Sequence, residues 1–123
     1  MFTIDQINEI HDTLGKATTL PAYLNALKAI GVVESVSFVT DGHTEHLGAD
    51  GYVVSTPPAH QTFTIAEVSD RRLLTEALKE TNYEKMSKAL ADSGIEKWIF
   101  DTHALTIAYL DKAANVLLKE DVR

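Results

Sequence analysis

The sequence predicts an α+β fold in which two tandem repeats, each a helix, a second helix and a three-stranded meander, form one pseudo-two-fold domain. The first observation is that the segment Phe2–Ile7 recurs sixty-one residues later, with similar residue types, as Phe63–Val68. The second is that each copy changes from helical to alternating apolar periodicity after a glycine, Gly31 in one copy and Gly94 in the other. Matches that keep their order along the chain indicate a tandem duplication.

A chain of 123 residues suits a single domain, residues 1–123, which buries roughly two-thirds of the surface that its unfolded form exposes. The predicted repeats cover residues 2–55 and 63–119, and the segment between them carries Pro57 and Pro58. Two consecutive prolines favour a stiff, extended linker. Because one meander with two helices is thin for an independent core, the copies are expected to pair their apolar faces or to share one sheet.

Each copy is predicted to open with a helix that starts at a capping box and is fixed by a hydrophobic staple. In a capping box, a Thr hydroxyl and a Glu or Gln side chain three residues later bond each other's free backbone amides. The capping pairs are Thr3 with Gln6 and Thr64 with Glu67, and the staple pairs are Phe2 with Ile7 and Phe63 with Val68. The apolar stripe of the first helix ends near Gly15.

A second helix is predicted to follow in each copy. Pro21 lies in the first turn of one, where its missing amide costs no helical hydrogen bond. Thr81 and Glu84 have capping-box spacing at the start of the other. Gly31 and Gly94 are expected to end these helices, because a chain that leaves a helix often adopts a left-handed conformation there.

Alternating apolar residues predict three strands in each copy. The predicted strands are Ser35–Thr40, Thr44–Leu47 and Tyr52–Ser55 in the first copy, and Lys97–Phe100, Leu105–Leu110 and Val116–Lys119 in the second. Asp41 and Asp101 each begin a turn between the first two strands of their copy, since an Asp side chain accepts hydrogen bonds from the backbone two residues on.

Composition and charge exclude several classes of function. The net charge is -7, and binding to a phosphate backbone requires a patch of Lys and Arg, so no nucleic-acid partner is expected. The absence of cysteine excludes a disulfide framework and a thiol nucleophile, and it suits a reducing compartment. No apolar run reaches the length of a membrane span, and the N-terminus lacks a signal-peptide layout. The prediction is a cytoplasmic protein with no membrane partner.

The main chemical candidate is a repeated Asp-x-His turn. Asp41 and His43 recur as Asp101 and His103, and His46 adds a further imidazole. If the two-fold brings the turns together, these side chains form a metal or acid/base site. Asp is ordinary in turns, however, and a neighbouring exposed His is usually only solvated. The sequence therefore favours no metal site and predicts no catalytic residue and no cofactor.

Three tyrosines are candidates for a small-molecule pocket between the two halves. They are Tyr23, Tyr83 and Tyr109, which lie on predicted helices and on a predicted strand. Aromatic residues in a domain of this size more often form the core, and that alternative stays open at this point.

The second copy carries a further pattern, which consists of Tyr83, Ser93-Gly94-Ile95, Phe100-Asp101 and Ala108-Tyr109-Leu110. In order, these residues belong to a tyrosine-led helix, its glycine-containing end, a strand that ends in an acidic residue, and a tyrosine-containing strand. With this pattern the second copy resembles one uncharacterised family of small bacterial and prophage-encoded proteins of the domain-of-unknown-function type, some loosely labelled phage envelope protein. Asn115 stands where the family often has glycine. The resemblance implies no activity and no catalytic residues.

The sequence thus predicts a small soluble, non-enzymatic binding or interaction module of phage-derived type. The alternative is a metal-dependent or acid/base enzyme that uses the two Asp-x-His turns. The expected partner is an unidentified protein or small molecule, and a homodimer is one candidate because short strands leave sheet edges free to pair.

Overall fold

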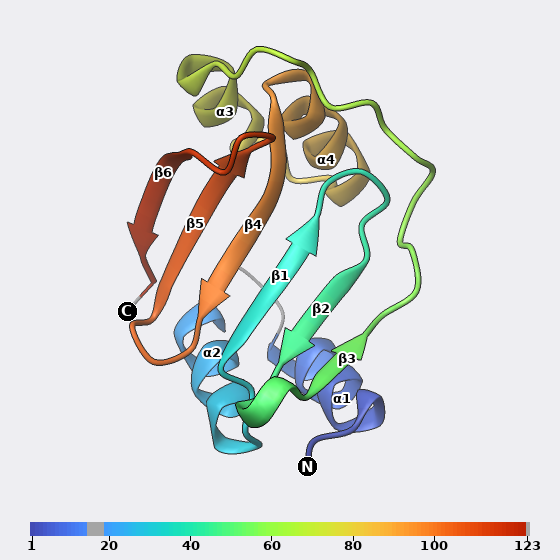
Figure 1. Ribbon diagram of the computed structural model, residues 1–123, viewed down its shortest axis with the longest axis vertical. Coiled ribbons are helices and arrows are strands. Elements are labelled where there is room, and N and C mark those ends of the chain that lie inside the picture. The colour runs from blue at the N-terminus through green and yellow to red at the C-terminus, as the bar shows by residue number, and fades with distance from the viewer. Residues whose placement is uncertain (15–18, 123) are drawn as a thin grey trace.

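The computed structural model describes residues 1–14 and 19–122, and these residues form an α+β fold with four α-helices and a six-stranded antiparallel sheet (Figure 1). This confirms the predicted fold class at the level of its elements. The elements are α1 (Ile4–Leu14), α2 (Leu20–Ala29), β1 (Glu34–Phe38), β2 (Thr44–Leu47), β3 (Val53–Ser55), α3 (Arg71–Ala77), α4 (Tyr83–Asp92), β4 (Ile95–Asp101), β5 (Thr106–Asp111) and β6 (Val116–Asp121). The order of two helices and three strands therefore occurs twice along the described chain.

The six strands share one sheet in the order β3-β2-β1-β4-β5-β6. The two meanders meet at its centre, where β1 and β4 pair antiparallel with Val36 opposite Ile99. The two meanders therefore share one sheet, which is one of the two arrangements that the sequence leaves open.

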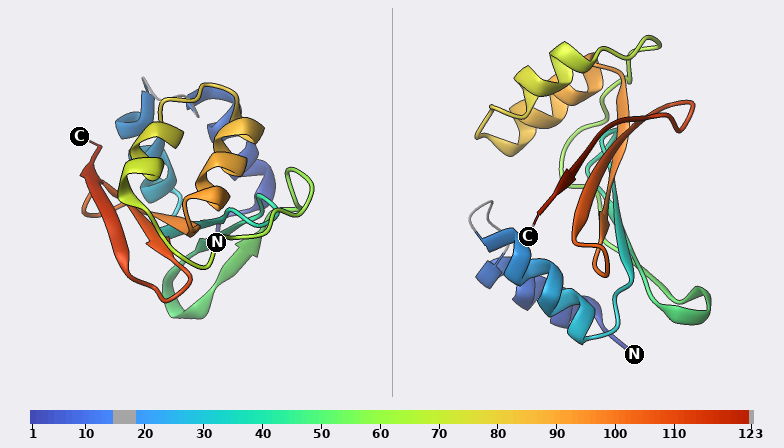
Figure 2. Two further views of the ribbon diagram at one scale, coloured as in Figure 1. Left: turned by 90° about the horizontal axis from the view of Figure 1, so that it is seen from above. Right: turned by 90° about the vertical axis from the view of Figure 1, so that its left-hand side faces the viewer.

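Both helical hairpins cover the same face of the sheet, α1 and α2 at one end and α3 and α4 at the other (Figure 2). No described helix lies over the opposite face. The molecule thus has a helix-covered face and an open face, and residues directly opposite each other on neighbouring strands point to the same one.

Two separate apolar clusters fill the space between the helices and the sheet. The cluster under α3 and α4 is built around Leu74, Leu90 and Trp98. The cluster under α1 and α2 contains Phe2, Ile7, Tyr23, Leu24, Leu27 and Val32. Phe100 on β4 packs against both clusters and joins them.

The first helix begins as the sequence predicts. The Thr3 backbone amide donates to Gln6 Oε1 over 2.8 Å, and the Gln6 amide donates to Thr3 Oγ1 over 3.3 Å, which completes the capping box. Phe2 and Ile7 are buried in one cluster, as a staple requires. α1 ends at Leu14, and the predicted end near Gly15 lies outside the described residues.

The corresponding prediction for the second half of the chain is wrong. Residues 64–67 are not helical, and α3 begins at Arg71 after Asp70, whose carboxylate accepts from the amides of Arg72 and Leu73. Val68 is 81% exposed and forms no staple. The segment is instead held extended by hydrogen bonds from its backbone amides to the carbonyls of Thr40 and Ala91, so tertiary pairing overrides the local capping pattern.

The second helices end as predicted but one of them starts differently. Gly31 and Gly94 have φ values of 102° and 83°, the left-handed conformation expected after a helix. α4 is capped by Asn82, whose Oδ1 accepts from the Lys85 amide over 3.0 Å, and not by Thr81. Asn is among the strongest N-cap residues, which explains the one-residue shift.

The strand registers relate the two halves at a larger spacing than the sequence matches indicate. Ser35 pairs with His46 in the first meander, and the corresponding pair in the second is Trp98 with Tyr109. The starts of α2 and α4, two helices of equal length, have the same separation along the chain as Ser35 and Trp98. The two Asp-x-His turns match at a spacing of sixty residues. They are therefore offset by three positions from the residues that correspond to each other in the strand registers.

Candidate functional site

The two Asp-x-His turns lie at opposite ends of the sheet (Figure 1). β1 and β4 run antiparallel with Phe38 opposite Lys97, so the turn after β1 adjoins the start of β4. The turn after β4 lies at the other end, where Asp101 is opposite Glu34. The hypothesis that the two turns converge is therefore wrong. Among the described residues, no group of three or more His, Asp or Glu side chains is arranged to hold a metal ion.

Each Asp instead stabilises its own turn. Asp41 Oδ1 accepts from the His43 backbone amide over 3.0 Å and lies 2.5 Å from His43 Nδ1, while the imidazole stacks on Phe38. The pKa of Asp41 is lowered, first by that backbone hydrogen bond and then by the His43 side chain. Asp101 Oδ1 accepts from the backbone amides of His103 and Ala104, both over 2.9 Å, and His103 is exposed.

Asp101→Ala is expected to lower the free energy of unfolding by about 1 kcal/mol, because two turn amides lose their acceptor. His103→Ala, the matched control in the same turn, is expected to cost roughly a few tenths of a kcal/mol, because its side chain is exposed. Urea denaturation of both variants measures the difference. Equal losses would contradict the assignment of the turn to Asp101. Micromolar zinc binding lost on removal of His43 and His103 would restore the metal hypothesis.

His46 lies away from both turns, on the helix-covered face of the sheet. It is 3% exposed, and its Nδ1 lies 2.7 Å from Ser35 Oγ, directly across the β1–β2 ladder. Burial, with a smaller contribution from the nearby His11, lowers the pKa of His46 to about 4. The imidazole is therefore neutral at pH 7 and is a buried hydrogen-bonding group.

A second polar pair occupies the next rung of the same ladder. Ser37 Oγ and Thr44 Oγ1 are 2.9 Å apart. Ser35, Ser37, Thr44 and His46 are called the polar cluster below. The sequence-based candidates included His46 but missed the three hydroxyl residues. The available signal was the spacing of Ser35 and Ser37, which puts small polar side chains on one face of a central strand.

The three candidate tyrosines do not line a common pocket. Tyr23 and Tyr109 are buried in different apolar clusters, whereas Tyr83 is 44% exposed. The Tyr23 ring packs edge-on against Phe100, and the Tyr83 ring packs edge-on against Trp98. Burial raises the pKa of Tyr23 to about 12, with a smaller contribution from Tyr83. Burial also raises the pKa of Tyr109.

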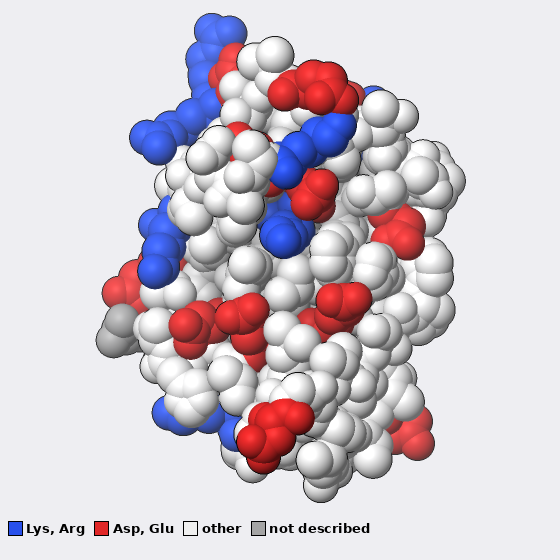
Figure 3. Space-filling model, in the orientation of Figure 1, with Lys and Arg blue, Asp and Glu red and all other residues white. Residues whose placement is uncertain are grey.

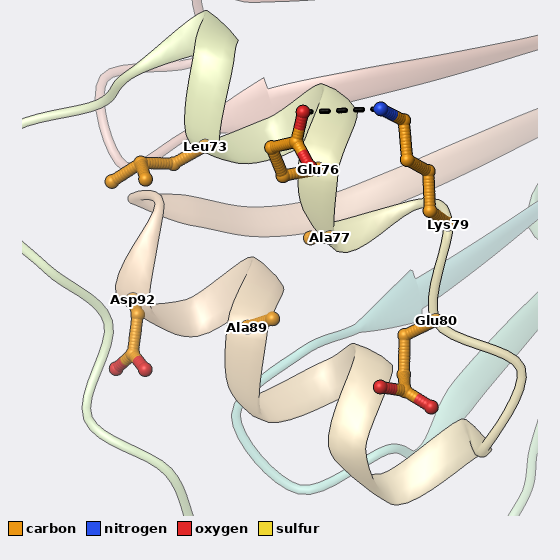
Figure 4. Close-up of a pocket in the computed structure, with 7 residues that line it drawn as sticks. All are labelled: Leu73, Glu76, Ala77, Lys79, Glu80, Ala89 and Asp92. Carbon is orange, nitrogen blue, oxygen red and sulfur yellow. Dashed lines mark hydrogen bonds and ion pairs between the residues drawn. The ribbon is translucent and has the colours of Figure 1, made fainter.

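A hollow of about 400 Å³ lies between α3 and α4 (Figure 4). Its lining residues are Leu73, Glu76, Ala77, Lys79, Glu80, Ala89 and Asp92. The carboxylates here bond neighbouring groups on the same hairpin: Glu76 pairs with Lys79 at 3.1 Å, and Asp92 pairs with Lys88 at 2.6 Å. The hollow therefore presents no converging set of polar groups that is typical of a catalytic site.

The open face of the sheet has no helical cover (Figure 2), and Figure 3 shows how charged residues are distributed over it. The strand registers place the following residues on it: Glu34, Val36, Phe38, Glu45, Leu47, Lys97, Ile99, Asp101, Ala108, Leu110, Lys119 and Asp121. Apolar side chains occupy its centre, and carboxylates lie toward the end of the sheet where Glu34 is directly opposite Asp101. Like charges in that position repel, which is unfavourable for the isolated sheet.

Within residues 1–14 and 19–122, no helix has the length and apolar character needed to cross a bilayer.

Comparison with known proteins identifies one family. Its model, described as a protein of unknown function (DUF1398), matches residues 8–121, a span that includes most of α1 and continues into β6. No curated protein matches the chain significantly. The family match covers both the polar cluster and the open face, and an association with phage stays a prediction.

Proposed function

Because the chain belongs to the DUF1398 family, whose description assigns no activity, we propose from the geometry that it is a small non-enzymatic interaction module. The module holds a basic protein partner on the open face of its sheet. The observation that carries this proposal is the combination of an apolar centre and an excess of carboxylates on a face that no described helix covers.

The partly exposed apolar side chains at the centre, those of Phe38, Ile99 and Ala108, supply the contact area. Ile99 lies opposite Val36 in the middle of the sheet, and Ala108 adjoins Ile99 on β5; Val36 and Leu110 on the same face are themselves 7% and 8% exposed. Phe38 and Leu110 continue this surface on the next rung, on either side of Lys97. Specific protein interfaces bury roughly 800 Å² per partner, so the partner must also contact the polar residues around this centre.

The charges select the partner. Four carboxylates, those of Glu34, Glu45, Asp101 and Asp121, share this face with the two lysines Lys97 and Lys119. Lys97 is also engaged locally, with its Nζ 5.9 Å from the centre of the Phe38 ring. A partner with Lys or Arg beside apolar residues relieves the repulsion between Glu34 and Asp101. A second copy of this chain brings the same acidic excess, which disfavours the homodimer.

A double variant, Glu34→Gln with Asp101→Asn, tests the proposal against a synthetic amphipathic Leu/Lys helix as the probe. Affinity measured by calorimetry at low salt is expected to fall at least about tenfold, equivalent to about 1.4 kcal/mol. Glu76→Gln with Asp92→Asn, on the hollow between α3 and α4, is the control because it changes the net charge equally. Its affinity is expected to stay within about twofold of the parent.

An equal loss of affinity in both double variants would mean that binding of the probe depends only on net charge. The assignment of the binding site to the open face would then be wrong. Sedimentation equilibrium provides the other check. A dimer that Ile99→Lys dissociates, while Leu73→Lys on α3 does not, would replace the basic partner with a second copy of the chain.

The enzyme alternative lacks a comparable supporting observation. Its proposed residues, Asp41 with His43 and Asp101 with His103, lie at opposite ends of the sheet and have no common substrate position. The geometry therefore supports the interaction module better.

We also infer that the two halves arose by tandem duplication and are related by a pseudo-two-fold axis near Val36 and Ile99. The inference is supported by two hydrogen bonds beside the central pair: the Val39 amide donates to the Glu96 carbonyl, and the Thr102 amide donates to the Val33 carbonyl. Val39 and Thr102, which donate, are as far apart along the chain as Val33 and Glu96, which accept. The strand registers relate residues of the two halves, such as Ser35 and Trp98, at the same separation. Superposing residues 20–55 on 83–119 in an experimental structure tests the inference, because a rotation far from a half-turn would contradict it.

A further inference from the structure

The charges on the open face are sorted by their position along the strands. One row across the sheet, at the end where β1 begins, carries three carboxylates and no basic side chain; from β1 to β6 it consists of Glu34, Asp101, Thr106 and Asp121. At the other end of the same strands, Lys97 lies between Phe38 and Leu110 and is the charged side chain of that row. Figure 3 shows that acidic side chains form a band across this face.

The row between these two is electrically balanced. Glu45 on β2 and Lys119 on β6 lie at its two sides, and its middle is apolar, with Val36, Ile99 and Ala108. The open face therefore changes from acidic to basic along the direction of the strands, and the partly exposed apolar side chains lie between the two ends.

The charges at the two ends are not neutralised within the chain. Among residues 1–14 and 19–122, Glu34, Asp101 and Lys97 take part in no salt bridge. All three side chains are partly buried. A charge that is partly removed from water and has no counterion gains free energy from a partner of opposite sign. Each end of the open face is thus suited to a different charge on the partner.

The separation of the two ends suits an α-helix that lies along the strands. Lys97 and Asp101 are both on β4, and the four-residue step between them spans about 13 Å. A helical side chain returns to the same face after about seven residues, which cover about 10.5 Å. Long charged side chains can bridge the small difference. One helix can therefore place a cation over the acidic row and a carboxylate over Lys97.

We propose that the partner contributes an amphipathic α-helix that lies on the open face in one direction, with its Lys or Arg end over Glu34 and Asp101 and an acidic side chain, about two turns away, over Lys97. This inference rests on the proposed function and adds the polarity of the partner to it. Apolar residues between the two charges contact Ile99 and Ala108. The reversed helix is disfavoured because like charges then face each other at both ends.

The probe is a synthetic Leu-rich helical peptide with two Lys residues at one end and one Glu two turns away on the same face. A nitroxide at its Lys end broadens nearby amide signals of the isotope-labelled full chain. Broadening is expected to be stronger at Glu34 and Asp101 than at Phe38 and Lys97. Glu34→Lys with Lys97→Glu keeps the net charge and is expected to remove this preference.

A double-mutant cycle tests Lys97 separately, with a second peptide in which Gln replaces the Glu. Lys97→Gln and the change in the peptide are each expected to weaken binding at least about threefold, and both together no more than either alone. Lys119→Gln is the matched control, because it removes the same charge from the same face but lies in the next row, on β6. Its effect is expected to be equal for the two peptides.

The proposed function and this inference can fail separately. If neither peptide shifts the amide signals of the open face, the proposed function is wrong and the inference is wrong with it. If the peptides bind there but the nitroxide broadens both rows equally or favours the row of Lys97, only the inference is overturned. The same holds if Lys97→Gln weakens both peptides to the same extent, because the face then binds a helix without a preferred direction.

Discussion

Trp98→Ala is expected to lower the free energy of unfolding by roughly 3–5 kcal/mol, the usual cost of emptying a large aromatic site in a core. Trp98 is 7% exposed and belongs to the cluster under α3 and α4, where Leu74 and Leu90 pack from the two helices. Its ring also supports Tyr83 through an edge-on contact with centroids 6.3 Å apart. The substitution therefore leaves a cavity between the sheet and both helices of the hairpin.

Guanidinium denaturation followed by circular dichroism measures this effect, because the variant loses the only tryptophan of the chain and with it the fluorescence signal. Val116→Ala is the control: Val116 is an exposed apolar residue on β6, and its loss is expected to change stability by less than about 0.5 kcal/mol. A midpoint for Trp98→Ala equal to that of the control would show that the indole is not part of the core.

Acidification from pH 7 toward pH 4 is expected to remove about 3 kcal/mol of stability through His46 alone. The pKa of this buried imidazole is about 4 in the folded chain and 6.5 in the unfolded chain, and each unit of difference corresponds to about 1.4 kcal/mol. Between these values the unfolded state binds more protons than the folded state, so unfolding becomes easier as pH falls. The stability is fully present above pH 6.5 and is lost as pH falls toward 4.

His46→Phe is expected to flatten the dependence of unfolding free energy on pH between about 4.5 and 7, whereas the control His103→Ala should keep the slope of the parent. The lowered pKa values of Asp41 and Asp111 act at more acidic pH and fall outside this window. Parallel pH profiles for the parent and His46→Phe would contradict the assignment.

Local signals predicted several features correctly. The capping box at Thr3 and Gln6 lies entirely within one helical turn, and the strand Thr44–Leu47 matches β2 at both ends. Gly31 and Gly94 mark helix ends because their conformation depends on only a few neighbouring residues. Such features depend on interactions between residues close in sequence, which is why a single sequence reveals them.

Features that depend on pairing between distant residues were not predicted. Thr64 and Glu67 have the spacing of a capping box, but the backbone of their segment is bonded to Thr40 and Ala91, and no local pattern reports such contacts. The register between strands also decides which residues of the two halves are equivalent. Asp is common in turns because its side chain accepts hydrogen bonds from the backbone. The repeated Asp-x-His therefore suggested that the two turns correspond to each other, but the strand registers of the two meanders do not support this.

The polar cluster shows the same contrast between local features and features that depend on distant residues. His46 was identifiable as a chemical group, but its partner Ser35 is eleven residues away and meets it only through the β1–β2 register. The pair becomes visible once that register is known, because residues directly opposite on neighbouring strands share a face.

The division of the interior into two clusters has a consequence for how the chain opens. Each helical hairpin covers its own cluster, and the polar cluster lies on the first meander, on the side of the sheet that the hairpins cover. Proteins open in cooperative units whose free energies differ, and a unit with fewer buried apolar contacts opens first. The cluster under α1 and α2 contains fewer buried apolar residues than the cluster under α3 and α4. The amides of α1 and α2 are therefore expected to exchange with solvent through a partly unfolded form in which α3, α4 and the second meander stay folded. That form exposes Ser35 and His46 without global unfolding.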